Sequence, residues 1–168
     1  TIEKLPEEVI EAIRTGKISE MQKRDERQKI LMREFGWPAG DARNVIAIEG
    51  TNILVNRIKG RQFVEDVIEH IKAGFRDAVN SCVLTREPAY GLKVNLEDIL
   101  IHEDPVHRGP AQIMPMTWRP IWGCFLLCEP KLLEPILSFE CKVPSDFVSQ
   151  VIAIVQKRRG KLLDIVSE

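Results

Sequence analysis

Two histidines and two carboxylic acids, His102, Glu103, Asp104 and His107, lie within six residues of one another near the middle of the chain. Side chains of these types can bind a metal ion or carry out acid–base catalysis. A zinc-binding helix places its two histidines four residues apart, whereas these two are five apart and Pro105 disfavours a helix between them. A metal or catalytic site would therefore have to be built from loops, and the sequence disfavours it.

The same stretch has the residues of a stiff loop. Pro105 and Pro110 each fix φ and bias the preceding residue toward extended conformations. Gly109 would let the backbone turn where other residues would be strained. We expect such a loop to hold one side chain outward, either His107 or Arg108.

The segments on either side must position this loop. Before it, Leu92, Val94 and Leu96 alternate as in a half-buried strand. Ile99 and Ile101 resume the alternation in the opposite phase, which indicates a bulge or turn between the two parts.

After the loop, residues 113–128 are apolar enough for a buried helix. Pro115 can occupy the first turn of that helix, whereas Pro120 would remove an interior hydrogen bond and kink it.

Other elements are predicted from apolar spacing and from residues typical of helix ends. Residues 60–79 form the clearest helix, and two short strands flank residues 50–52. A helix opens at Pro6, and a charged helix over residues 19–35 has Ser19 as its expected cap. Residues 37–40 indicate a turn.

Composition limits the classes of function. The chain has 168 residues and is 44% apolar, which is enough for a real core, and 24 basic against 25 acidic residues leave a net charge of −1. A protein that coats nucleic acid would carry excess positive charge, so any RNA contact must be local. No phosphate-binding G-x-x-x-x-G-K-[ST] motif occurs, and no apolar run could span a bilayer. We expect a monomeric cytoplasmic protein.

The four cysteines, Cys82, Cys124, Cys128 and Cys141, lack the paired spacing of a zinc site. Cys124 and Cys128 lie one helical turn apart in an apolar run. We interpret all four as reduced cysteines that are buried as small apolar residues.

Residues 102–115 resemble the tip loop of domain IV of archaeal and eukaryotic elongation factor 2, in which His-Arg-Gly precedes two small residues, Gln and an aliphatic residue. Gly109-Pro110-Ala111-Gln112 is similar to the archaeal form. Further segments match in the same order. They are Leu5-Pro6-Glu7-Glu8-Val9, Phe35-Gly36-Trp37, Gly50-Thr51-Asn52, Ala73-Gly74-Phe75 and Leu132-Leu133-Glu134-Pro135-Ile136.

The resemblance implies an α+β fold in two parts. Residues 1–129 would be domain IV, a split β-α-β sandwich of sheet and helices that lacks its N-terminal portion. Residues 130–168 would be the start of domain V, an incomplete ferredoxin-like β-α-β unit with strands over residues 137–143 and 162–166. Ser145 would cap the intervening helix, and Gly160 would end it.

The resemblance also implies a function, namely GTP-dependent translocation of tRNA and mRNA on the ribosome. Domain IV would enter the decoding site of the small subunit, mimic an anticodon arm and contact mRNA and peptidyl-tRNA. His107 would carry diphthamide, made by diphthamide-synthesis enzymes, and would be a target of a diphtheria-toxin-type ADP-ribosyltransferase. This chain would hold no cofactor, because GTP and magnesium bind an upstream domain of the parent protein, and it would not be an enzyme.

Individual residues receive roles on this basis. RNA contact is assigned to His107, Arg108, Gly109 and Pro110, and support of the loop to His102, Asp104 and Gln112. A further candidate for RNA contact is the basic cluster at the end of the last predicted helix, Lys157, Arg158, Arg159 and Lys161. Such residues also commonly complement the negative end of a helix.

Two other functions remain open from the sequence. The chain could be a stand-alone RNA- or ribosome-binding paralogue without a GTPase domain. It could also be a metalloenzyme built from the loop residues around His102 and His107, which predicts stoichiometric metal in the purified protein.

Overall fold

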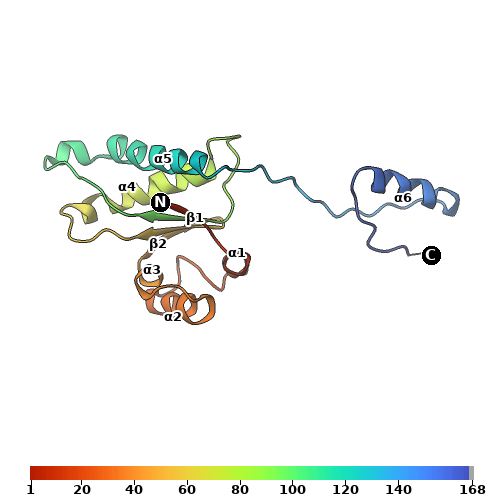
Figure 1. Cartoon of the computed structure of the whole chain (residues 1–168), viewed down its shortest axis with the longest axis horizontal. Helices are drawn as coiled ribbons and strands as arrows, with labels where there is room; N and C mark the ends of the chain where they lie inside the picture. Colours follow the sequence, from red (N-terminus) through yellow and green to blue (C-terminus); the bar gives the residue numbers. More distant parts are fainter. Residues whose placement is uncertain (167–168) are drawn as a thin grey trace. The chain divides into compact units, whose positions relative to one another are not determined.

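A mixed β-sheet organises the first part of the molecule (Figure 1). The computed structural model describes residues 1–166, and these form a four-stranded sheet with the order β1-β4-β3-β2. Strands β2 and β3 form an antiparallel hairpin, β3 and β4 run parallel, and β1 is antiparallel to β4. The strands are β1 (Ile2–Lys4), β2 (Val45–Glu49), β3 (Asn52–Asn56) and β4 (Leu92–Leu96).

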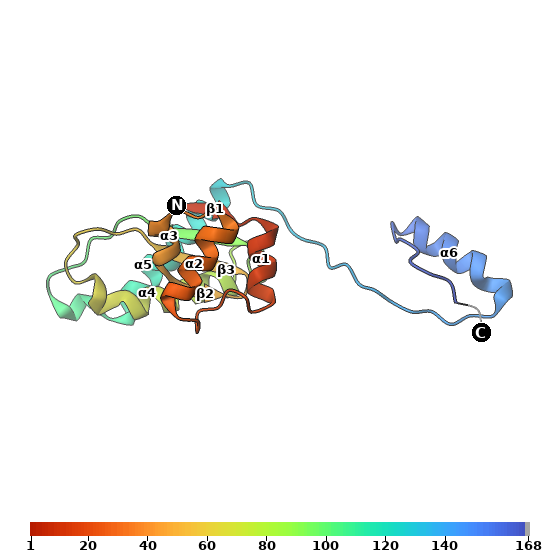
Figure 2. The ribbon, with the colours of Figure 1, turned by 90° about the horizontal axis from the view of Figure 1, so that it is seen from below.

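Helices cover both faces of this sheet (Figures 1 and 2). Helices α4 (Val64–Asn80) and α5 (Pro110–Leu127) pack on one face. The opposite face is covered by α1 (Glu7–Arg14), α2 (Arg24–Phe35) and α3 (Ala39–Arg43). Each face has its own apolar core, so the α+β class predicted from the sequence is confirmed.

Helix α4 confirms the strongest periodic pattern in the sequence. Val67, Ile71, Phe75 and Ala78 recur at helical spacing, and all four are fully buried between α4, α5 and the sheet. The helix starts four residues later than predicted, because Phe63 adopts a left-handed backbone conformation with φ of 62° and separates α4 from the preceding loop.

The hairpin of β2 and β3 is also as predicted, and the buried Asn52 connects it to the rest of the sheet. The Asn52 side-chain amide donates to the carbonyl oxygens of Glu49 and Ala89, at 3.1 and 2.9 Å, and its oxygen accepts from the Leu92 N–H group at 3.0 Å. The amide nitrogen thus donates two hydrogen bonds and the amide oxygen accepts one, as a buried amide requires. Asn52 holds the segment before β4 beside β3.

Strand β4 differs from the half-buried strand that its alternation predicts. Lys93 and Asn95, which were expected on an exposed face, are only 8% and 2% exposed. The reason is that α1–α3 cover the second face of the sheet. The Lys93 ammonium group is paired there with Asp41 at 2.8 Å and lies 4.7 Å from the centre of the Trp37 ring. Residues 97–101 continue as irregular chain and not as a strand.

The charged helix predicted from Ser19 begins only at Arg24. The Ser19 hydroxyl accepts from the Met21 N–H group at 3.3 Å in a turn, so the prediction that Ser19 caps the helix is wrong. The buried Arg27 guanidinium accounts for the difference. It donates to the carbonyl oxygens of Ser19 and Glu20, at 3.1 and 3.2 Å, and keeps that segment as a loop.

Two further local predictions change. The turn expected at residues 37–40 leads directly into the short helix α3, with Pro38 just before its first residue. Residues 1–4 contain strand β1, for which no sequence pattern was identified. With three residues, β1 is too short to show a period of two, and its pairing with β4 depends on long-range contacts.

Helix α5 runs from Pro110 to Leu127 and includes both Pro115 and Pro120. It begins three residues earlier than predicted, because Pro110 occupies its first turn, where a missing N–H group has no consequence. Its packing against α4 is close at Gly74, where an added Cβ would lie 2.8 Å from Thr117 Cβ and 2.9 Å from the Met114 carbonyl oxygen.

Residues Leu132–Glu168 form a separate compact unit, which contains η2 (Ser145–Phe147) and α6 (Val148–Lys157). The strands predicted at 137–143 and 162–166 are absent from the described residues, and Leu137 and Phe139 are 82% and 69% exposed. A strand needs a neighbouring strand for its backbone hydrogen bonds, and a single β-α-β unit offers too few.

The ends of α6 also differ from the prediction. Ser145 lies in the short η2 helix and does not cap α6, whose N-terminal cap position is Phe147. At the other end, Arg159 adopts the left-handed conformation, with φ of 64°, and the Gly160 N–H group donates to the Val155 carbonyl oxygen at 2.8 Å. The helix is closed by Arg159 and Gly160 together.

Candidate functional site

The stiff loop predicted between β4 and α5 contains a short 3-10 helix, η1 (Pro105–Arg108). Pro105 is its first residue, and the Asp104 carboxylate accepts from the Val106 N–H group at 3.0 Å. The His107 N–H group donates to the Asp104 carbonyl oxygen at 3.1 Å. Asp104 therefore closes the turn through both its side chain and its backbone. We use the name tip loop for residues 102–109, the part of residues 102–115 that precedes α5.

The glycine of the tip loop plays a different part from the one expected. Gly109 has φ of −71° and ψ of 165°, an extended conformation that other residues adopt without strain. Its conformation follows from the proline after it, which disfavours the helical region for the preceding residue. The Gly109 carbonyl oxygen accepts from the Gln112 N–H group at 3.1 Å, so Gln112 connects the tip loop to the first turn of α5 through its backbone.

Both histidines of the tip loop are exposed, and their rings touch. The two ring centres are 4.6 Å apart, with an angle of 71° between the ring planes, which is an edge-to-face arrangement. His102 Nδ1 also accepts from the Asp104 N–H group at 3.0 Å. His102 is thereby held against the start of the turn and supports the ring of His107, which faces solvent.

Arg108 points inward, although it directly follows the exposed His107. Its guanidinium donates to the His102 carbonyl oxygen and to the Asp66 carboxylate, both at 2.8 Å, and to the Glu103 carbonyl oxygen. It also stacks on the Phe63 ring, with 3.6 Å to the ring centre, and only 10% of the side chain is exposed. Of the two candidates for the outward side chain, His107 is therefore the exposed one, whereas the charged group of Arg108 is engaged in contacts within the protein. Contact of Arg108 with RNA stays a prediction.

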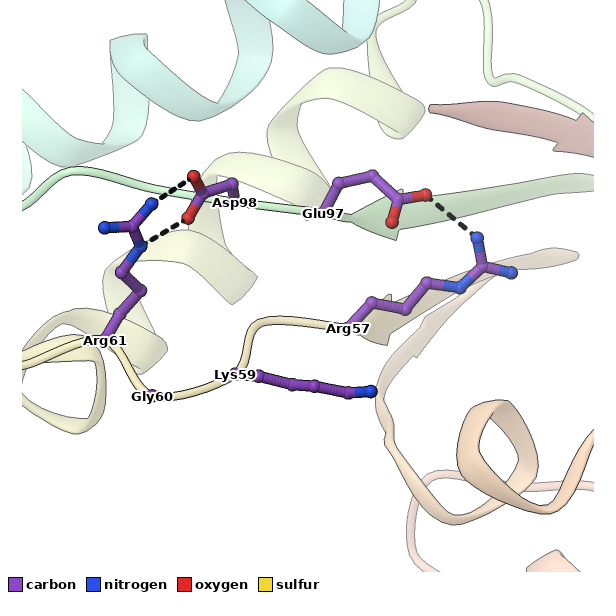
Figure 3. A pocket seen from close by; sticks show the side chains of 6 residues that line it. All are labelled: Arg57, Lys59, Gly60, Arg61, Glu97 and Asp98. Atoms are coloured by element: carbon purple, nitrogen blue, oxygen red, sulfur yellow. Dashed lines mark hydrogen bonds and ion pairs between the residues drawn. The ribbon is translucent and has the colours of Figure 1, made fainter.

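The loop that leads to Phe63 lines a shallow polar groove of about 470 Å³ (Figure 3). Its charged side chains form ion pairs across the groove: Arg61 meets Asp98 through two hydrogen bonds of 2.7 and 2.5 Å, and Arg57 meets Glu97 at 2.9 Å. No local pattern in the sequence indicates this groove, because its two sides come from segments almost 40 residues apart. The groove is lined by Arg57, Lys59, Gly60, Arg61, Glu97 and Asp98.

Arg57, which lines the groove, also belongs to a cluster of charged side chains formed with the buried Asp41 of α3 and Lys93 of β4. Its guanidinium donates to both carboxylate oxygens of Asp41, at 2.9 and 2.6 Å. These hydrogen bonds, together with Lys93, lower the pKa of Asp41 to about 2 against the effect of burial, which raises it. The cluster fixes α3 to β3 and β4 and so fixes the base from which the loop of residues 57–63 starts.

The predicted basic cluster lies at the end of α6 in the second unit, where all four side chains are exposed. Arg159 is paired with Glu134 at 3.2 Å, and the pair is open to solvent. The backbone N–H group of Arg158 donates to the carbonyl oxygens of Ile154 and Val155. Nothing in these contacts points to RNA, so contact through Lys157, Arg158, Arg159 and Lys161 stays a prediction.

The cysteines are only partly as predicted. Cys82 is buried, and burial raises the pKa of its thiol. Cys128 and Cys141 are exposed, so the prediction that all four are buried is wrong. Among residues 1–166, no three histidine, cysteine or carboxylate side chains come together as a metal site would require. Within the same part of the chain, no helix is long and apolar enough to cross a membrane.

Comparison with known proteins gives consistent results. The family model for elongation factor G, domain IV, matches residues 16–129. The chain is 42% identical over 169 residues to an elongation factor 2 of Pyrobaculum neutrophilum, and 41% identical over 166 residues to one of Saccharolobus islandicus. These matches cover 99% and 98% of this chain. The chain spans about 23% of the length of each of these curated relatives.

Proposed function

The chain belongs to the elongation factor G domain IV family, and we propose that it is the ribosome-binding part of an elongation factor 2 that moves tRNA and mRNA during translation. In this proposal the tip loop enters the decoding site of the small subunit and contacts mRNA and peptidyl-tRNA. GTP and magnesium are bound by another domain of the longer protein, and residues 1–166 bind and position RNA in the cytoplasm without catalysing a reaction themselves.

The observation that carries the proposal is the placement of His107. The ring is exposed at the tip of a turn that is closed by Asp104, supported by His102 and bounded by Pro105 and Pro110. A side chain that is already ordered loses little entropy when it binds, so a rigid loop favours contact with RNA. An exposed imidazole is also accessible to a modifying enzyme.

In this proposal His107 carries diphthamide, which is added by the diphthamide-synthesis enzymes and recognised by a diphtheria-toxin-type ADP-ribosyltransferase. The appendage is long and cationic and ends in an amide. It could therefore donate hydrogen bonds to 2′-hydroxyl and phosphate groups in the shallow minor groove of RNA, where shape is read more than sequence. Gly109 and Pro110 lie beside His107 and would form the adjoining surface, while Arg108 would act from within the loop.

The modification is tested by tandem mass spectrometry of the peptide that contains His107, using protein purified from its native host. We expect a diphthamide mass increment on His107 and none on His70, which lies on α4 outside the tip loop. An unmodified His107 in native material would contradict the mechanism. The stand-alone paralogue would then become the leading hypothesis, and the reading frame around this chain would show whether a GTPase domain accompanies it.

A further inference from the structure

The geometry points to a clamp: we propose that Arg108 is a positioning residue that fastens the tip loop to α4 and thereby sets the orientation of His107. The importance of that orientation for RNA contact or modification rests on the proposed function. The clamp itself does not, because it is formed entirely by contacts within the protein.

The Arg108 guanidinium donates to three acceptors in two segments of the chain. Nε and Nη2 donate to the carbonyl oxygens of His102 and Glu103 at the beginning of the tip loop. Nη1 donates to the Asp66 carboxylate in the first turn of α4. Since Arg108 itself lies at the end of the tip loop, its side chain closes the loop on itself and ties the closed loop to the helix. A planar guanidinium with several fixed donors suits this arrangement, and a lysine ammonium does not.

Phe63 provides the floor of the clamp. Its φ of 62° is uncommon for a residue other than glycine and has an energetic cost, so surrounding contacts must hold it. This conformation places the ring beneath the Arg108 guanidinium, at 3.6 Å from the ring centre, where a cation–π contact stabilises both groups. The same loop continues back to Arg61 and the groove, so the clamp joins the tip loop to the loop of residues 57–63.

The clamp acts on His107 through its two neighbours. Arg108 fixes the backbone on one side of the His107 ring. On the other side it holds the carbonyl oxygen of His102, whose ring contacts the His107 ring at 4.6 Å. Release of the guanidinium would free both ends of the turn at once, and His107 would lose its single orientation while remaining exposed.

The clamp is tested first in the 168-residue chain with Arg108→Lys. This change keeps the positive charge but removes the planar fork of donors that reaches the three acceptors while its face stacks on Phe63. By NMR, we expect amide hydrogen exchange at Val106 and His107 to become about tenfold faster, because charge-assisted hydrogen bonds that close the loop are lost. The contact between the His102 and His107 rings should disappear. Arg61→Lys is the matched control, because Arg61 is paired with Asp98 outside the tip loop.

Two further variants separate positioning from simple destabilisation. Phe63→Tyr keeps an aromatic floor and should retain the exchange rates of the unaltered chain, whereas Phe63→Leu removes the ring face and should raise them as Arg108→Lys does. The thermal midpoints of all variants should agree closely with that of Arg61→Lys. Unchanged exchange at Val106 and His107 in Arg108→Lys would overturn the clamp.

The second measurement concerns His107 in the longer protein expressed in its native host. In Arg108→Lys the modified fraction of His107, measured by mass spectrometry, should fall about fivefold or more below that of Arg61→Lys, if an ordered turn is what the modifying enzyme recognises. Equal modified fractions alongside accelerated exchange would overturn the positioning role. Absence of modification in the unaltered protein would count against the proposed function, while the NMR comparison would still decide whether the clamp exists.

Discussion

His107 and Arg108 are consecutive residues with opposite environments. Both are polar, both follow Pro105, and the sequence offers no means of deciding which one points outward. The orientation of Arg108 depends on Phe63 and Asp66, which are about 40 residues away in the chain. The Phe63 ring and the Asp66 carboxylate contact the guanidinium and hold it against the protein. An RNA-contact surface inferred from motif residues alone would therefore include Arg108, whose guanidinium is already bound to groups of the protein itself.

Asp41 is a second residue whose role depends on distant partners. It accepts from Arg57, a residue of the groove, and from the buried Lys93 of β4. Its carboxyl group ordinarily has a pKa of 3.8, and in the folded protein the Arg57 hydrogen bonds lower it to about 2. Since a group with a lowered pKa favours the folded state when it is ionised, Asp41 stabilises the protein above pH 3.8.

This stabilisation should be lost as the pH falls from about 4 to about 2, because the carboxylate is protonated first in the unfolded chain and then in the folded one. The shift corresponds to about 2 kcal/mol of unfolding free energy. Asp41→Asn should therefore be less stable than the unaltered chain by at least about 2 kcal/mol at pH 7, with the difference narrowing below pH 4. Urea unfolding at a series of pH values measures this.

Asp77→Asn is the matched control, because Asp77 is exposed near the end of α4. Its stability should follow that of the unaltered chain within about 0.5 kcal/mol. A pH-independent gap between Asp41→Asn and the unaltered chain would show that the carboxylate does not titrate as proposed.

At the scale of elements, the contact between α4 and α5 determines where the tip loop ends. Helix α5 starts directly after the tip loop, and its Ile113 and Ile121 are buried against α4 and the sheet. Gly74 brings the helices together, since the Met114 backbone occupies the space that a side chain would need. A well-packed interface of this kind transmits any displacement of α5 to the loop that precedes it.

Gly74→Ala should destabilise the protein by about 1–3 kcal/mol, because its Cβ would overlap Thr117 and the Met114 carbonyl oxygen, which cannot move without displacing the helix. Gly123→Ala is the control within α5, since its added Cβ would have no atom within 4 Å apart from its chain neighbours and the adjacent backbone of its own helix. That change should be neutral or stabilising by up to about 1 kcal/mol, as expected for alanine replacing glycine in a helix. Thermal unfolding of the two variants measures this difference in stability. Equal unfolding midpoints would contradict the close packing at Gly74.

At the scale of the whole molecule, the described residues fall into two units, residues 1–131 and residues 132–166. The first has two apolar cores on either side of a sheet and contains all of the tip loop. In the second unit, α6 has no fully buried side chain. The difference in burial predicts a difference in stability, because apolar burial is the main favourable contribution to folding.

Removal of residues 132–168 should therefore leave the unfolding free energy of the remainder within about 0.5 kcal/mol of its value in the intact chain. The truncated chain should also keep the amide spectrum of the tip loop, because the Arg108 contacts all lie within the first unit. Circular dichroism during urea unfolding and an NMR amide spectrum test both points. A large loss of stability would show that the two units fold as one.

Local patterns in the sequence predicted several features correctly. The apolar spacing of Val67, Ile71 and Phe75 indicates α4, and the strands around residues 50–52 indicate the hairpin. The two prolines indicate a stiff loop between β4 and α5. The collinear motifs identify the elongation factor family. These features depend on neighbours within a few residues, and for that reason a single sequence contains them.

Other features were decided only by the tertiary structure, because they depend on residues that are distant from one another in the chain. The pairing of β1 with β4, the burial of Lys93 on the second face of the sheet and the inward turn of Arg108 all require segments at least 40 residues apart to meet. The strands predicted in residues 132–166 fail for the same reason. The apolar residues of a strand are present there, but the described residues of this unit include no partner strand. The sequence by itself determined that a stiff loop presents one of two side chains, His107 or Arg108. The folded chain decided that His107 faces outward and Arg108 inward, since only folding brings Phe63 and Asp66 to Arg108.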